Sequence, residues 1–169
     1  MNAPAAFPAE PRPTGLVPHA TVAGMSGLDF LRAMFAGDFP APPFSLPSQI
    51  YGLEVEEGRV LFGGRPSEQF YNPLGTIHGG WTTMILDSAL GCAVQSVLPA
   101  GQGFTTIELK VNFVRPVTAA TGEVRCVGTI VHKGGRILTS EARLTDARDR
   151  LLAHATSTCM ALELAGAKG

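Results

Sequence analysis

The sequence predicts an α+β fold in which one long buried helix lies on a curved antiparallel sheet. Residues 80–98 repeat apolar and small side chains at helical spacing and contain no Lys, Arg or Glu. A helix with so few charges is normally buried. The segments after it alternate apolar and polar residues and are separated by short turns, as strands are. A hairpin, then a helix, then a meander of strands favours a helix packed on one face of a sheet.

The length and composition restrict the class of protein. The 169 residues are enough for one domain, and 45% hydrophobic against 16% charged residues is typical of a globular chain. A formal net charge of −1 argues against nucleic acid as a partner. The sequence has no apolar run of 18 residues and no signal-like N-terminus, so we expect neither a membrane span nor secretion. Three isolated cysteines (Cys92, Cys126, Cys159) are expected to be reduced thiols in the cytoplasm.

Proline divides the chain, since nine of its 13 prolines lie in the first 50 residues. We call residues 1–48 the N-terminal extension. Residues 1–22 hold few large apolar side chains and are predicted to be a flexible tail. Residues 23–48 are predicted to form a short helix, capped by Ser26 and stopped by Gly37, followed by a Pro-rich strap. The main domain is then expected to span residues 49–164.

Strands are predicted by alternation within this domain. A hairpin is expected within residues 53–63, with a Gly-containing turn. Residues 106–113 alternate strictly, which places four apolar residues on one face and polar residues on the other (Ile107, Leu109, Val111, Phe113). Three further strands are expected at 123–131, 136–145 and 151–162.

The densest group of candidate functional residues lies in residues 72–87. A loop ends in Gly79 and Gly80 and enters the buried helix, where free backbone N–H groups can bind a developing negative charge. Asp87 follows two turns later as a carboxylate on an otherwise uncharged helix. A buried carboxylate is unfavourable unless it is paired or used, so Asp87 is a functional candidate.

Structural roles for the same residues stay open on this evidence. Two glycines before a helix are common in loops, and His78 can simply cap the helix. Asp87 can accept a structural hydrogen bond from Thr106 or Arg115. No His, Cys and carboxylate residues have the spacing of a metal site, so no metal is expected. Neither a nucleophilic Ser motif nor a phosphate-binding loop occurs.

The spacing of Asn72, His78-Gly79-Gly80 and Asp87 resembles that of hot-dog-fold acyl-CoA thioesterases of the phenylacetate-degradation (PaaI-like) type. The similarity continues through residues 86–91, 105–116 and 153–155, and the Pro-rich strap looks like the extension of one branch of the family. The resemblance implies a helix wrapped by an antiparallel sheet, and subunits joined edge to edge as a homodimer at least, with a homotetramer expected. It also implies hydrolysis of acyl-CoA to free acid and coenzyme A, with no separate cofactor because coenzyme A is part of the substrate.

The resemblance also implies site roles. The Gly79 N–H would polarise the thioester carbonyl, Asp87 would be nucleophile or general base, and Asn72 and Thr106 would orient the carboxylate or its water. His78 would support the site. This chemistry needs a donor where negative charge develops and a carboxylate to attack or deliver water. Apart from the resemblance, substrate binding is expected of Gly80, of Tyr71 and Trp81 near an aryl or medium-chain acyl group, and of Lys133 and Arg136 near the phosphates of coenzyme A. Core packing of the two aromatic residues and a solvated charged turn at the two cations stay open as alternatives.

The helix geometry places these groups in two subunits. Gly79 and Asp87 are eight positions apart, which is about 12 Å along one helix at ~1.5 Å per residue. A reacting carbonyl must lie within roughly 3 Å of both its donor and the attacking group. We therefore expect composite sites, with Asn72 and Gly79 from one chain and Asp87 with Thr106 from the other.

Two other functions remain as alternatives. A hot-dog hydratase or dehydratase acts on acyl thioesters and moves a proton at carbon, commonly through a His paired with an acid. A non-catalytic module would bind acyl-CoA and leave Asp87 as a structural acceptor.

Overall fold

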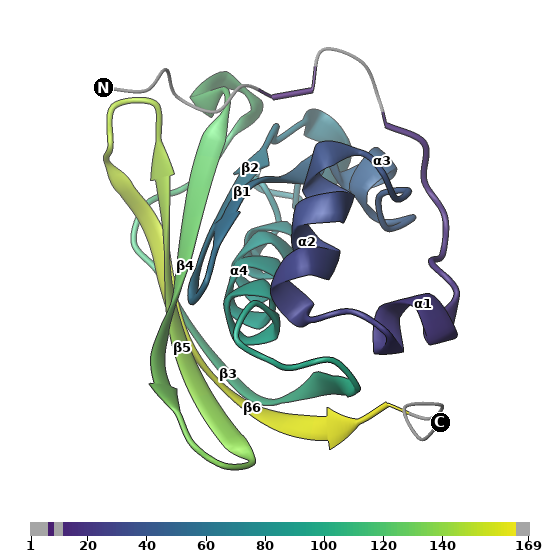
Figure 1. Ribbon diagram of the computed structural model, residues 1–169. Helices are drawn as coiled ribbons and strands as arrows, with labels where there is room; N and C mark the ends of the chain where they lie inside the picture. Colours follow the sequence, from purple (N-terminus) through teal and green to yellow (C-terminus); the bar gives the residue numbers. More distant parts are fainter. Residues whose placement is uncertain (1–6, 9–11, 165–169) are drawn as a thin grey trace.

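The computed structural model describes residues 7–8 and 12–164 (Figure 1). It consists of a curved six-stranded antiparallel sheet with strand order β1-β2-β4-β5-β6-β3, and α4 (Gly79–Gln95) lies in its concave face. The α+β prediction is confirmed. The strands are β1 (Ile50–Glu56), β2 (Arg59–Gly64), β3 (Gln102–Phe113), β4 (Val124–Lys133), β5 (Ile137–Asp146) and β6 (Leu151–Glu163). Two short 3-10 turns span Glu68–Phe70 and Ala119–Thr121.

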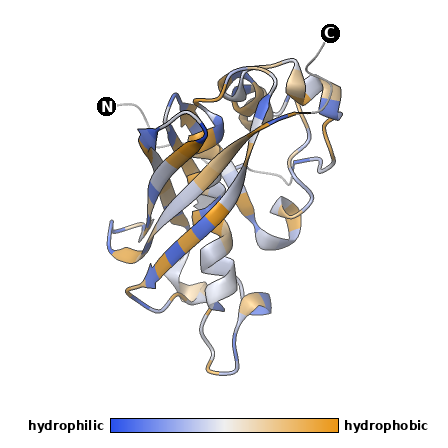
Figure 2. Ribbon diagram, turned by 90° about the horizontal axis from the view of Figure 1, so that it is seen from below, coloured by the Kyte–Doolittle hydropathy of each residue, from blue (hydrophilic) through white to orange (hydrophobic). Residues whose placement is uncertain are grey.

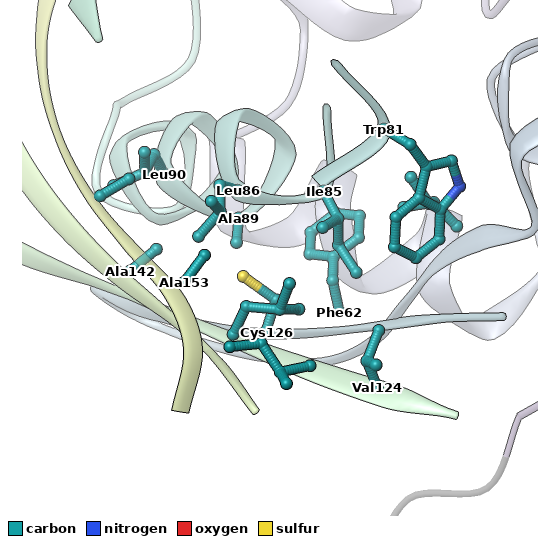
Figure 3. Packing of buried hydrophobic residues seen from close by; sticks show 14 of the residues in the cluster. Phe62, Trp81, Ile85, Leu86, Ala89, Leu90, Val124, Cys126, Ala142 and Ala153 are labelled. Atoms are coloured by element: carbon teal, nitrogen blue, oxygen red, sulfur yellow. The ribbon is translucent and has the colours of Figure 1, made fainter. Parts of the chain in front are cut away.

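The main core forms between α4 and the sheet (Figure 3). One side of the helix packs against apolar side chains of β2, β4, β5 and β6 (Trp81, Ile85, Leu86, Ala89, Leu90 against Phe62, Val124, Cys126, Ala142, Ala153). Gly128 of β4 permits this close approach, because a Cβ there would lie 2.3 Å from the carbonyl oxygen of Ala89. The strands alternate in hydropathy along their length, as Figure 2 shows. Within the described residues, no helix is long and apolar enough to span a membrane.

The prediction that Ile107 shares one face of β3 with Leu109, Val111 and Phe113 is wrong. Ile107 and Phe113 are 53% and 59% exposed, whereas Leu109 and Val111 pack against the core. The register between β3 and β6 shifts between Thr106 and Glu108, so Ile107 is the extra residue of a β-bulge. Strict alternation therefore breaks at this point. Thr106 before the bulge and Leu109 after it both face α4, although they are three residues apart.

The described part of the N-terminal extension covers the face of α4 that points away from the sheet (Figure 1). The expected helix is present as α2 (Gly27–Ala36), with the Ser26 hydroxyl accepting the Asp29 N–H and Gly37 in the left-handed region at φ 98°. Two more short helices, α1 (His19–Ala23) and α3 (Ser45–Ser48), flank it. The Gly27 N–H donates to the carbonyl oxygen of Leu98, which ties α2 to the chain after α4.

Several described residues of the predicted flexible tail make specific contacts with the domain. Phe7 is 9% exposed and packs on Gly63 of β2, and the Arg65 guanidinium lies over its ring. Arg12 donates to the carbonyl oxygen of Phe35 at 2.6 Å, and Thr14 forms a bridge with Ala41. A Pro-rich segment loses less backbone entropy on docking than an ordinary one. Few apolar side chains are therefore sufficient to hold this segment on the domain. Residues on both sides of the expected boundary at residue 22 make contacts with the rest of the protein.

Candidate active site

The loop before α4 is organised by Asn72. Its side-chain oxygen accepts the N–H groups of Leu74 (2.9 Å) and Thr76 (3.3 Å), and its amide nitrogen donates to the Thr76 hydroxyl (2.9 Å). The Ile77 N–H donates to the carbonyl oxygen of Val117. Together these bonds hold the loop that delivers the chain to the start of α4. Asn72 keeps one amide hydrogen without an acceptor among the described residues.

The backbone N–H groups at the start of α4 differ in their partners. His78 is the N-cap residue, and its Nδ1 accepts the Gly80 N–H at 2.9 Å, so the ring proton of a neutral His78 is on Nε2. The Trp81 N–H donates to the His78 carbonyl oxygen. The Gly79 N–H has no acceptor in the part of the chain that the structure describes. It is available to a ligand, and the helix dipole adds partial positive charge there.

Gly79 opens onto a hollow of about 310 Å³ whose lining includes Thr82, Phe113 and Arg115. A Cβ on Gly79 would lie 3.1 Å from the Phe113 ring, so glycine keeps this approach open. The predicted donor is thus accessible, whereas the Gly80 N–H, predicted for substrate binding, is already bonded to His78.

Asp87 lies in the middle of α4 and is the sole charged residue of that helix. It is half-buried, and its Oδ1 accepts the Thr106 hydroxyl at 3.3 Å. The β3 bulge after Thr106 brings this hydroxyl to the helix. The structure therefore brings Asp87 and Thr106 together. Asn72, His78 and Gly79 are grouped at the helix start, eight residues away on the same continuous helix.

The wall of an apolar cavity includes Asp87. This cavity has a volume of about 240 Å³ and lies between α4, β1, β2 and the N-terminal extension. On α4 its wall continues through Ser88, Gly91 and Cys92. Burial, with a smaller contribution from the charge of Asp87, raises the pKa of the Cys92 thiol to about 12. Cys92 is therefore a neutral thiol at physiological pH and unsuited to nucleophilic attack.

The other residues predicted to bind substrate lie elsewhere. Trp81 is 2% exposed, and its indole N–H donates to the Ser48 carbonyl oxygen. The Tyr71 hydroxyl accepts the Ala119 N–H. Neither side chain lines the cavity beside Asp87. That they bind the acyl group stays a prediction, and their positions argue against it. Lys133 and Arg136 are exposed at the β4–β5 turn, where the Lys133 ammonium donates to the carbonyl oxygen of Val97.

Sequence reasoning missed most of the cavity. Its lining joins α2, the strap, β1, β2, α4 and β3, and side chains far apart in the chain form it (Met34, Phe35, Ala41, Phe44, Tyr51, Phe62, Phe104). The available signal was the recurrence of Phe35, Phe39 and Phe44 in and beside a Pro-rich segment, which is unusual for a surface linker. Among the described residues, no cluster of His, Cys, Asp or Glu could hold a metal ion.

Comparison with known proteins adds independent findings. Residues 74–153 match the family model described as the thioesterase superfamily. No curated protein matches the chain significantly. A phenylacetic acid degradation-related protein from Ralstonia eutropha JMP134 is similar in structure, with a TM-score of 0.71 and 26% identity over 78% of this chain and 98% of that one.

A thioesterase family protein from Silicibacter pomeroyi is similar at TM-score 0.70 and 26% identity, over 81% of this chain and 98% of that one. The PaaI protein of the Escherichia coli phenylacetic acid degradation operon has the same fold, with a TM-score of 0.69 and 17% identity over 81% of this chain and 94% of that one. The hot-dog fold that the sequence predicted is confirmed by these structures, and the match of residues 74–153 to the thioesterase superfamily model agrees with the family that the motifs resemble.

Proposed function

We propose that this chain is a PaaI-like hot-dog thioesterase, an enzyme that hydrolyses thioesters. Its substrate is acyl-CoA, and Asp87 is the carboxylate that attacks the carbonyl carbon or activates the attacking water. The observation that carries the proposal is the position of Asp87. It is the sole charge on α4, is half-buried in the wall of an apolar cavity, and is oriented by the Thr106 hydroxyl. A carboxylate so placed can meet the carbonyl carbon of a bound thioester.

The Gly79 N–H supplies the second requirement of the reaction. With Asp87 as general base, a water loses its proton to the carboxylate and attacks the carbonyl carbon. The oxygen of the tetrahedral intermediate then carries the negative charge and accepts the Gly79 N–H. When the C–S bond breaks, coenzyme A leaves as a thiolate and takes the proton from Asp87.

With Asp87 as nucleophile, a carboxylate oxygen attacks the same carbon and expels the thiolate. The resulting mixed anhydride is then hydrolysed by water, which regenerates the carboxylate. In both routes the Gly79 N–H and the Asp87 carboxylate must reach the same thioester carbonyl. Both routes are compatible with the contacts of Asp87.

The site is proposed to be shared by two subunits of a homodimer. Support comes from the continuous helix, which separates Gly79 from Asp87 by about 12 Å, too far for one carbonyl. Further support comes from β3, a sheet edge with Ile107 and Phe113 exposed, of which Phe113 adjoins Gly79. A second copy paired along this edge would place its Asp87 and Thr106 against the first copy's Asn72 and Gly79. Assembly of such dimers into a homotetramer is part of the same proposal.

Coenzyme A recognition is proposed for the exposed Lys133 and Arg136, whose cations suit phosphate groups. A Streptococcus mutans protein of the same fold, with a TM-score of 0.62 and 21% identity over 68% of this chain and 90% of that one, was solved with acetyl-CoA bound. The protein is proposed to act in the cytoplasm without cofactor, metal, nucleic acid or membrane.

Release of free thiol from a panel of acyl-CoAs tests the function directly. Thiol release at a rate proportional to enzyme supports it, with aryl and medium-chain acyl groups expected to be the best substrates. A change in enoyl absorbance without thiol release would instead identify a hydratase. A rise in Tm with acyl-CoA and no turnover would identify a binding module.

A further inference from the structure

We propose that the cavity beneath the N-terminal extension holds the acyl group and that residues of this extension select which acyl groups are hydrolysed. The inference rests on the proposed thioesterase function and deepens it. It locates the specificity in a segment that precedes the thioesterase family match, which begins at residue 74.

The cavity has a reactive wall and an apolar roof. Asp87 and Ser88 of α4 contribute the wall, and Met34, Ala41 and Phe44 of the extension contribute part of the roof. A thioester whose carbonyl lies at Asp87 would therefore extend its acyl group away from water and under the extension. Burial of an apolar group in this way is favourable in proportion to the apolar surface that it removes from water.

The volume limits the acyl group that fits. An engineered apolar cavity of roughly 150 Å³ is sufficient to bind benzene. The 240 Å³ found here is larger by more than half, and suits a single aromatic ring with a short linker or a medium-length straight chain. An acetyl group would leave most of this space empty, so short acyl groups should be poor substrates.

The lining favours aromatic groups in particular. Five aromatic side chains line the cavity, and the Phe35 and Phe62 rings meet edge to face with centroids 5.5 Å apart (Phe35, Phe44, Tyr51, Phe62, Phe104). Gly91 keeps space open on the helix side, because a Cβ there would lie 2.6 Å from the Phe104 ring. Ring-to-ring contacts add attraction beyond the buried area.

The roof is attached by defined hydrogen bonds. The Ala41 N–H donates to the Pro13 carbonyl oxygen at 2.9 Å, and the Gly15 N–H donates to the Ala41 carbonyl oxygen at 3.0 Å. Arg12, itself in the cavity wall, donates to the carbonyl oxygen of Phe35 at the end of α2. The extension is thus positioned to fix the size of the cavity and so to discriminate between acyl groups of different length.

Two opposite changes of volume test this inference. Ala41→Leu adds side-chain atoms inside the cavity, and Phe44→Ala removes a ring from it. The readout is kcat/KM for butanoyl-, hexanoyl-, octanoyl-, dodecanoyl- and phenylacetyl-CoA. Ala41→Leu should lower the octanoyl-to-butanoyl ratio about 10-fold or more, since one methylene in an apolar pocket changes discrimination by 10-fold or more. Phe44→Ala should raise the dodecanoyl-to-octanoyl ratio by a similar factor.

Phe39→Ala is the matched control. Phe39 lies in the same Pro-rich strap and packs against Phe30 with ring centroids 5.9 Å apart, but it does not line the cavity. This variant should keep the wild-type length profile. Unchanged profiles in folded Ala41→Leu and Phe44→Ala would overturn the inference, and so would an equal shift in Phe39→Ala.

Binding separates failure of the cavity assignment from failure of the proposed activity. If the wild type releases no thiol from any acyl-CoA, the thioesterase proposal fails. Calorimetric affinities for octanoyl-CoA and free coenzyme A then test the cavity alone. Tighter binding of octanoyl-CoA that Ala41→Leu weakens supports the inference, and equal affinity of wild type and variant refutes it. Should either variant fail to fold, Met34→Trp replaces Ala41→Leu and Met34→Ala replaces Phe44→Ala, with the same expected shifts.

Discussion

The start and the middle of α4 differ in how they hold the two groups that thioester hydrolysis needs. At the start, the Asn72 side chain and the His78 ring bind neighbouring N–H groups, and the Gly79 N–H has no partner within the described part of the chain. In the middle, Asp87 faces an apolar cavity and has one side-chain donor, Thr106, from another element. The donor therefore depends on local backbone geometry, whereas the carboxylate depends on tertiary packing.

This contrast predicts that side-chain changes are most damaging in the middle of the helix. Asp87→Asn should lower kcat by about 10²–10⁴-fold, because the amide can neither attack nor accept the proton of water. The change preserves shape, so Tm should stay close to that of the wild type. An active, folded Asn variant would remove Asp87 from the mechanism.

At the start of α4, activity should depend on a backbone N–H group and not on a side chain. Gly79→Pro removes the free N–H, and its effect on the fold should be small because proline suits the first helical position and His78 is already extended at ψ 136°. We expect a loss of about 10²–10³-fold in kcat, as for removal of an oxyanion donor. Gly79→Ala is the matched control, since it keeps the N–H and also approaches Phe113. Equal losses in both variants would indicate crowding at Phe113 and not the donor.

The contact between Thr106 and Asp87 should contribute less. Thr106→Val removes the hydroxyl and keeps the shape, and we expect kcat to fall roughly 10- to 100-fold, the range of one hydrogen bond to a charged group. Thr106→Ser should restore most of the activity. Thr105→Val, at the exposed neighbouring position, should behave like the wild type. If both valine variants lose activity equally, the cause is the strand and not this hydroxyl.

Mixed dimers test whether the two regions of α4 act on one substrate from different chains. Asp87→Asn and Asn72→Ala should each be inactive alone. In a mixed dimer one site collects both lesions and the other is wild type. Random reassociation makes half the dimers mixed, so activity should return to roughly a quarter of that of the wild type. Mixtures that stay inactive after subunit exchange is verified by mass would disprove the shared site.

The sequence alone determined the features that depend on neighbouring residues. The period of α4, the Ser26 cap, the Gly37 stop and the spacing of Gly79 and Asp87 are local patterns, and the structure places each element within a few residues of its expected bounds. Local patterns specify helices and strands because their hydrogen bonds and side-chain directions repeat over short distances. The family resemblance also rests on short motifs around this helix.

Only the tertiary structure decided what lies around Asp87. Alternation in β3 predicted Ile107 on the same face as Leu109, but a bulge against β6 turned Ile107 to the other face and brought Thr106 to the carboxylate. The Pro-rich extension was expected to carry a flexible tail, yet Phe7 and Arg12 dock on the domain and Phe44 lines a cavity with Asp87. Bulges and cavities result from contacts between residues far apart in the chain, and no local pattern specifies which distant surfaces will meet.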